Sequence, residues 1–148
     1  MSYYNDNNRN QIPGFSDIIT KHIGNKNDGV VVDVGANDGW RWSNSWPLIN
    51  AGWSGLLIEP HPKHINRIKK LYEGRVDVEI VQKAVSNYSG KTTLFEGDSL
   101  TTIKPEIIVG FEQSSWAKGH MTGNTLEVEV NTLDDILEKS NIKPTFDV

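Results

Sequence analysis

The stretch VVVDVGANDG, residues 30–39, decides the fold of this chain. It opens as a run of β-branched apolar residues, which is typical of a strand buried on both faces in a parallel α/β sheet. Asp33 interrupts the run, and Gly35 and Gly39 bracket a turn where glycine tolerates positive φ and lets a ligand approach the backbone. A buried strand followed by an acid, a glycine turn and a helix predicts a nucleotide-type pocket.

The composition of the turn indicates which ligand it binds. A dinucleotide site needs G-x-G-x-x-G, so that bare N–H groups face a pyrophosphate, whereas this turn reads GANDG. A nicotinamide dehydrogenase domain, which would share the fold, is an alternative that needs these glycines, and this turn lacks two of them. Asp33 and Asp38 put negative charge where a phosphate would lie, which is costly, and they suit the cationic S-adenosylmethionine better. The cofactor contacts that we expect from this stretch are Asp33, Gly35, Ala36, Asn37, Asp38 and Gly39.

A second acid favours an adenosine ligand. Residues 53–60, WSGLLIEP, predict a short buried strand that ends at Glu59. An acid that follows the glycine turn by roughly 20 residues can accept hydrogen bonds from ribose hydroxyls. We therefore add Glu59 and Pro60 to the expected cofactor contacts; either acid alone is equally well explained as a strand-end residue that faces water.

The N-terminal part predicts an arm and a helix. Residues 1–13 are rich in Asn, Tyr and Asp without a period, which is typical of a mobile arm, and residues 14–148 form the expected domain. Apolar residues at helical spacing over residues 15–23 predict a helix that packs on the sheet, with Ser16 as its N-cap and Gly24 as its stop.

Aromatic and basic residues follow the turn and the second strand. A helix is expected from about Ser45, with Trp46 in the core, while Trp40 and Trp42 suit either the core or an aromatic wall beside the ligand. A second helix begins at Pro62. We expect its two histidines, His61 and His64, to lie on a solvated face rather than to bind a metal, because no further ligand stands at a matching offset.

The second half predicts more strands and one long loop. Residues 76–85 alternate and predict a third strand, at whose end Lys83 and Ala84 would meet the adenine. Residues 91–95 and 125–130 predict an antiparallel pair, and residues 131–139 a helix. The polar residues 97–124 form a loop long enough to be functional or disordered, and His120 within it is a candidate general base.

Several of these stretches together resemble a known family. The segments VVDVGANDG (31–39), GWSGLLIEPHP (52–62), VQKAVS (81–86) and LEVEVNTLDDIL (126–137) resemble the FkbM-type methyltransferases. The resemblance implies an α/β, Rossmann-like class I methyltransferase sheet with flanking helices and S-adenosylmethionine as cofactor. It also implies methylation of a hydroxyl oxygen on a sugar or another small molecule, with residues 97–124 toward the acceptor.

The last residues resemble the start of another strand. Phe146, Asp147 and Val148 match a buried strand that in the family continues beside the first one, so the sheet is expected to be incomplete after its third parallel strand. The strand at residues 30–34 would then be an apolar edge that invites a partner chain or a homo-oligomer. A non-catalytic, truncated methyltransferase-like domain is the alternative function.

The bulk composition excludes several classes of function. The 148 residues carry a net charge of −4, which argues against a nucleic-acid partner. No apolar run approaches the roughly 18 residues of a membrane span, and no secretory signal is visible, so a cytoplasmic protein without a membrane partner is expected. The chain has no cysteine, which excludes disulfides and thiolate chemistry.

Overall fold

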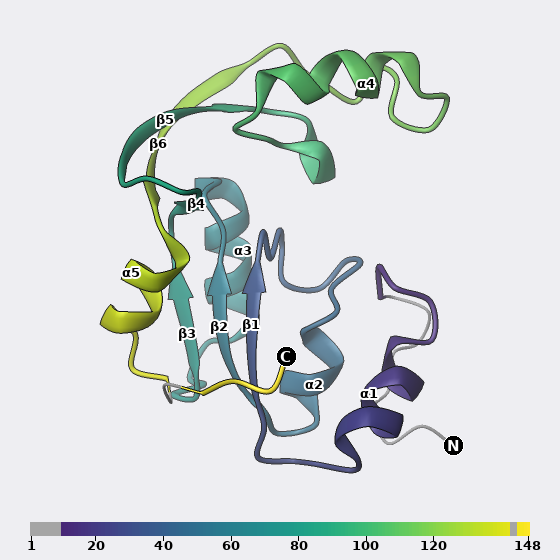
Figure 1. Ribbon diagram of the computed structural model, residues 1–148, viewed down its shortest axis with the longest axis vertical. Coiled ribbons are helices and arrows are strands. Elements are labelled where there is room, and N and C mark those ends of the chain that lie inside the picture. Colours follow the sequence, from purple (N-terminus) through teal and green to yellow (C-terminus); the bar gives the residue numbers. More distant parts are fainter. Residues whose placement is uncertain (1–9, 143–144) are drawn as a thin grey trace.

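A three-stranded parallel sheet forms the centre of the molecule (Figure 1). The computed structural model describes residues 10–142 and 145–148, so most of the expected N-terminal arm, residues 1–9, lies outside the described residues. The strands β1 (Val30–Val34), β2 (Ser54–Ile58) and β3 (Val78–Val81) run in the order β1-β2-β3. The two strands predicted at residues 30–34 and 53–60 are therefore confirmed, and they lie side by side.

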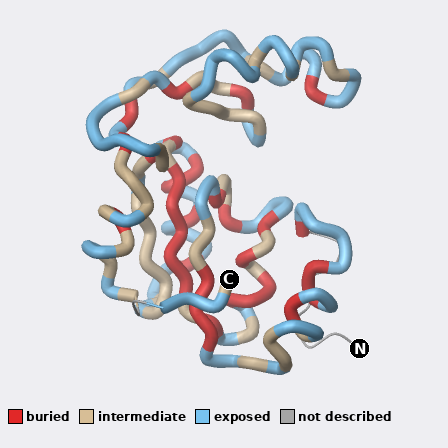
Figure 2. Tube along the Cα trace, in the orientation of Figure 1, coloured by how far each residue is buried: buried red, intermediate tan, exposed pale blue. Residues whose placement is uncertain are grey.

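Helices cover both faces of this sheet. On one face, apolar side chains of α1 (Phe15–Ile23), α2 (Trp46–Asn50) and α3 (Pro62–Leu71) pack against Val31 and Leu57. On the other face, α5 (Leu133–Lys139) packs against Leu56 and Ile58. The central strand β2 is almost wholly buried between these layers, as Figure 2 shows, because its leucine and isoleucine side chains pack on both of its faces. The expected α/β sheet with flanking helices is confirmed.

A second, smaller sheet follows the first. Its strands β4 (Ala84–Val85), β5 (Gly90–Phe95) and β6 (Thr125–Asn131) run in the order β4-β6-β5. The predicted antiparallel pair is confirmed, with Leu94 opposite Leu126. The prediction of one strand over residues 76–85 is wrong. Backbone pairing with the first sheet ends where Glu59 donates to Val81, and β4 then pairs with β6 instead.

The segment predicted as one long polar loop, residues 97–124, contains regular structure. It holds two 3₁₀ turns, η1 (Asp98–Leu100) and η2 (Pro105–Ile107), and the short helix α4 (Ile108–Gln113). Phe95 and Thr102 exchange backbone hydrogen bonds of 2.8 and 3.0 Å, which fold residues 96–101 back as a compact hairpin-like segment. Residues 98–104 form one wall of a hollow at the carboxyl ends of β1 and β2.

For helix α1, the predicted C-terminal stop is confirmed and the predicted N-cap is wrong. Gly24 ends the helix as predicted, with φ at +83°. Ser16 is not the N-cap, because Gly14 occupies that position and the Ser16 hydroxyl is buried inside the first turn. The helix therefore begins at Phe15, a buried core residue, and its N-cap stands two residues earlier than predicted.

The C-terminal residues lie along the free edge of β1. Val148 accepts a hydrogen bond from the Val32 N–H (2.8 Å) and donates to the Val30 carbonyl (3.3 Å), which is the alternation of a parallel neighbour. Asp147 accepts from the Val30 N–H at 2.9 Å. The expected strand-like position beside the first strand is therefore observed, although Phe146 is exposed rather than buried. Among the described residues, no helix is both long and apolar enough to cross a membrane.

Candidate functional site

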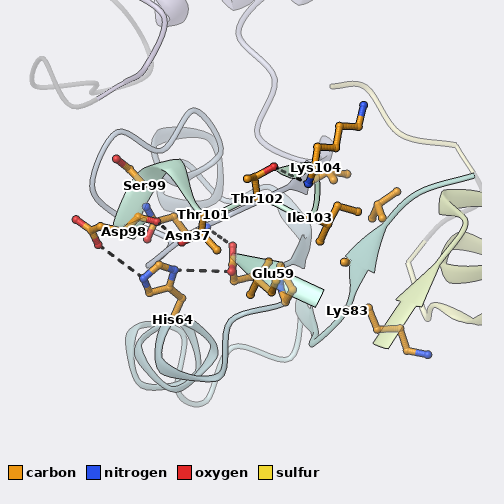
Figure 3. A pocket seen from close by; sticks show the side chains of 16 residues that line it. Asn37, Glu59, His64, Lys83, Asp98, Ser99, Thr101, Thr102, Ile103 and Lys104 are labelled. Carbon is orange, nitrogen blue, oxygen red and sulfur yellow. Dashed lines mark hydrogen bonds and ion pairs between the residues drawn. The ribbon is translucent and has the colours of Figure 1, made fainter. Parts of the chain in front are cut away.

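The carboxyl ends of β1 and β2 open into a hollow of about 260 Å³ that is partly open to solvent (Figure 3). This is the edge at which open α/β sheets bind their ligands. One side of the hollow comes from the first sheet and its turn, and the other from residues 98–104. The residues of the first side and of the floor are Val34, Gly35, Asn37, Glu59, Pro60, His64, Lys83, Ala84, Val85 and Leu94.

The glycine turn is held against the end of β2 by backbone hydrogen bonds. Gly35 and Ala36 both donate to the Ile58 carbonyl, at 2.8 and 3.1 Å. Gly35 has φ at +81°, and a Cβ built there would meet no atom within 4 Å, so the backbone faces open space as a close ligand requires. Gly39 closes the turn with φ at +74° and a 2.9 Å bond to the Ala36 carbonyl.

Glu59 is the most firmly held acid of the hollow. Its side chain is buried, with the residue only 5% exposed, and one carboxylate oxygen accepts from the Asn37 N–H at 3.0 Å. The other oxygen accepts from the His61 N–H at 2.9 Å. A carboxylate offers about four lone-pair sites, so two backbone donors leave acceptor capacity for a diol. The geometry fits the predicted contact to ribose hydroxyls.

Asp33 lies in a second hollow that adjoins the first. This smaller hollow, of about 130 Å³, shares Val34, Gly35, Asn37 and Ser99 with the larger one. Burial raises the pKa of the Asp33 carboxyl, the hydrogen bond from the Ser45 hydroxyl opposes that rise, and the nearby Glu59 charge adds to it. The two acids therefore flank one glycine turn, one on either side, rather than facing each other across a single hollow.

The other predicted cofactor contacts divide into two groups. Pro60 and Ala84 line the main hollow and Ala36 the Asp33 hollow. Asp38 instead turns back on its own loop, where it accepts from the backbone N–H groups of Trp40 and Arg41 at 3.1 and 2.8 Å. Asp38 therefore stabilises its own loop and lines neither hollow.

Two further predicted residues lie at or beyond the border of the hollow. Lys83 lines the main hollow, but its ammonium group binds Asn131 at 2.7 Å and Glu129 at 3.2 Å in the second sheet, which leaves the backbone toward the hollow. Gly39 packs against Ile68 and Tyr72 of the α3 region, outside the lining. The ammonium group of Lys83 is therefore held by the second sheet, and Gly39 lies outside the lining of the hollow.

His120, the candidate base, is exposed and follows α4 in the chain. It does not line either hollow. Of the three tryptophans, Trp46 packs against the core as predicted, whereas Trp42 is 59% exposed and lines the Asp33 hollow. Trp40 is also exposed and lies away from both hollows.

The solvated face predicted for His61 and His64 is wrong, because both side chains are buried. They lie under residues 96–104, a segment that folds back over α3. No local sequence pattern predicts this fold-back. Tyr72 is likewise buried, donates to the Gly39 carbonyl at 3.3 Å, and has a pKa raised far above its usual range by burial. No cluster of metal-ligating side chains is found in the described part of the chain.

A parallel sheet with a glycine turn after its first strand and an acid after its second places the chain among the Rossmann-like α/β proteins. A family model described as the methyltransferase FkbM domain matches residues 33–148. The chain therefore belongs to the FkbM methyltransferase domain family, as the sequence resemblance implied, and this membership supports a methyltransferase function. A search among curated proteins found no match.

Proposed function

We propose that the protein binds S-adenosylmethionine at the glycine turn and transfers its methyl group to a hydroxyl oxygen of a sugar or another small molecule. The observation that carries this proposal is the placement of Glu59, whose buried carboxylate is fixed by two backbone N–H groups at the end of β2 with lone pairs to spare. Family membership supports the choice of a methyl donor over a dinucleotide.

The chain's own residues have distinct tasks in this scheme. Glu59 would accept from the ribose hydroxyls, and the open backbone at Gly35 would let the ligand approach the turn. Asp33 would face the cationic methionine part, and a bound cation favours its ionised form. When bound, the cofactor supplies a methyl group on a positively charged sulfur; the acceptor oxygen gains that methyl, the carbon–sulfur bond breaks, and the hydroxyl proton leaves to solvent.

Catalysis of this kind rests mainly on position. Methyl transfer needs donor and acceptor in line and little covalent help, so fixing both in a site shielded from water supplies most of the rate gain. The wall at residues 98–104 would shield the main hollow from water, and the residues that line the Asp33 hollow would shield the other part of the site. His120 lies outside both linings, which favours a mechanism without an assigned protein base.

Calorimetric titration with S-adenosylmethionine tests the proposal. Glu59→Gln is expected to weaken binding by about 10- to 100-fold, because the ribose hydroxyls lose a charged acceptor. The matched control is Glu73→Gln, an exposed acid after α3. An unchanged affinity in Glu59→Gln, or binding of NADH in preference to S-adenosylmethionine, would contradict the proposed function.

The charge of Asp33 gives a sharper comparison. S-adenosylhomocysteine lacks the sulfonium charge, so Asp33→Asn is expected to weaken binding of S-adenosylmethionine more than binding of S-adenosylhomocysteine. The chemistry of the product tests the acceptor: with methyl-labelled cofactor and hydroxylated small molecules, an ether-linked methyl group survives alkali, whereas a methyl ester is hydrolysed. Alkali-labile label would contradict transfer to a hydroxyl.

A further inference from the structure

The wall of the cofactor hollow at residues 96–104, here called the wall segment, is attached to the first sheet through side chains. In the part of the chain that the structure describes, its backbone hydrogen bonds stay within the segment or go to its neighbours, such as the pairs Phe95–Thr102 and Glu96–Asn124. The contacts that reach the turn and α3 are ion pairs of Glu96 and Asp98. The position of this wall therefore depends on a few charged groups.

His61 makes the first of these contacts. Its Nδ1 accepts from the Lys63 N–H at 3.1 Å and so caps α3, while its Nε2 lies 2.7 Å from a carboxylate oxygen of Glu96. Since Nδ1 is the acceptor, Nε2 carries the proton and donates to Glu96. This hydrogen bond lowers the pKa of the Glu96 carboxyl.

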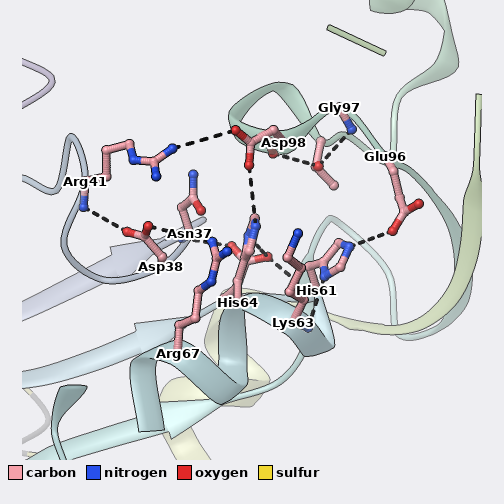
Figure 4. Close-up of polar contacts among 12 residues, drawn as sticks. Asn37, Asp38, Arg41, His61, Lys63, His64, Arg67, Glu96, Gly97 and Asp98 are labelled. Atoms are coloured by element: carbon pink, nitrogen blue, oxygen red, sulfur yellow. Dashed lines mark hydrogen bonds and ion pairs between the residues drawn. The ribbon is translucent and has the colours of Figure 1, made fainter. Parts of the chain in front are cut away.

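His64 stands in a different situation (Figure 4). It is 3% exposed and stacks on the His61 ring with centroids 4.8 Å apart. Its Nδ1 lies 3.7 Å from a Glu59 oxygen, and its Nε2 lies 3.9 Å from an Asp98 oxygen. Both ring nitrogens thus face carboxylates. A neutral imidazole would turn a lone pair toward one of them, whereas an imidazolium presents N–H groups to both.

We propose that His64 is a positioning residue that couples the Glu59 carboxylate to the wall segment: its buried ring lies between Glu59 on one side and Asp98 on the other, and so holds the wall over the cofactor hollow. The inference rests on the proposed function for the part that concerns cofactor affinity. Several charged and titratable side chains surround His64. Those at the end of β2 and in or next to α3 are Glu59, His61, Lys63 and Arg67. Those from the elements packed against α3 are Asp38, Arg41, Glu96 and Asp98.

The expected effect on the cofactor follows from this placement. Loss of the His64 ring uncouples the wall segment from Glu59, so the affinity for S-adenosylmethionine is expected to fall in His64→Gln. The expected loss is about tenfold, the fold-change that one interaction with a charged group supplies.

A matched variant separates this role from the loss of any histidine. His22→Gln removes an exposed histidine of α1 and is expected to retain the wild-type affinity. Wild-type affinity in His64→Gln would overturn the proposal.

Hydrogen exchange without cofactor tests the coupling independently of the proposed function. At one fixed pH of about 6, the amides of residues 96–104 are expected to exchange faster in His64→Gln than in the wild type, by about tenfold. Asp98→Asn is a second probe, since its side chain is largely exposed and its loss leaves the buried contacts of His64 in place. Faster exchange in both variants supports the coupling even if S-adenosylmethionine does not bind; unchanged exchange in Asp98→Asn refutes it.

Discussion

Replacing Glu59 by alanine should loosen the glycine turn and the start of α3, and lower the stability of the whole domain. The Glu59 carboxylate is the partner of two backbone donors, the N–H of Asn37 in the turn and the N–H of His61 at the start of α3. The hydrogen bond from Asn37 is partly buried, and the hydrogen bond from His61 is buried. Each N–H left without a partner costs about 1–3 kcal/mol, so the expected loss in the free energy of unfolding is about 2–6 kcal/mol.

Glu59→Gln should lie between the wild type and Glu59→Ala. The amide oxygen of glutamine can accept from one N–H, but its NH₂ group faces the other donor, so we expect a loss of about 1–3 kcal/mol. Urea unfolding followed by tryptophan fluorescence measures these changes, because Trp53 is fully buried in the folded core. A loss below about 0.5 kcal/mol in Glu59→Ala, no larger than in the exposed control Glu73→Gln, would refute the reasoning.

Two further predictions concern the charge of Asp33 and a tight contact in the core. Since burial raises the pKa of Asp33 above its ordinary 3.8, the folded state holds the proton more tightly than the unfolded state, and stability falls as pH rises from that value through the folded pKa. Asp33→Asn should therefore raise the melting temperature at pH 7, and this gain should vanish toward pH 4; a gain that is independent of pH would speak against the burial of a charge. Gly29→Ala should cost about 1–3 kcal/mol, because its Cβ would lie 2.5 Å from the buried Trp53 ring, whereas Gly110→Ala, in open space within α4, should be neutral or stabilising; thermal melts that rank the two equally would contradict the packing argument.

The sequence predicted the parallel core because its signals are local. A run of β-branched residues, an acid and two glycines specify a strand and a turn over ten residues, and the ends of β1 and β2 follow from the positions of Gly35 and Glu59. The pairing of β5 with β6 was also predictable, since residues 125–130 alternate in polarity and follow a second short strand-forming run at residues 91–95. Parallel strands bring their carboxyl ends to one edge, so the meeting of the turn with Glu59 follows from topology.

The burial of His61 and His64 was not predictable in the same way. Next to lysine and arginine on a helix, both histidines look solvent-exposed, and what buries them is a segment more than 30 residues away that carries Glu96 and Asp98. The break between β3 and β4 has a similar cause, because β6, far along the chain, captures Ala84. Tertiary partners of this kind leave no periodic signal in the segment that they cover.

The most direct test of the central claim is a crystal structure with S-adenosylmethionine bound. The account predicts both ribose hydroxyls within about 2.5–3.0 Å of the Glu59 carboxylate and the sulfonium on the side of the turn where Asp33 lies. A ribose that lies away from Glu59, or a ligand outside the two hollows beside Gly35, would contradict it.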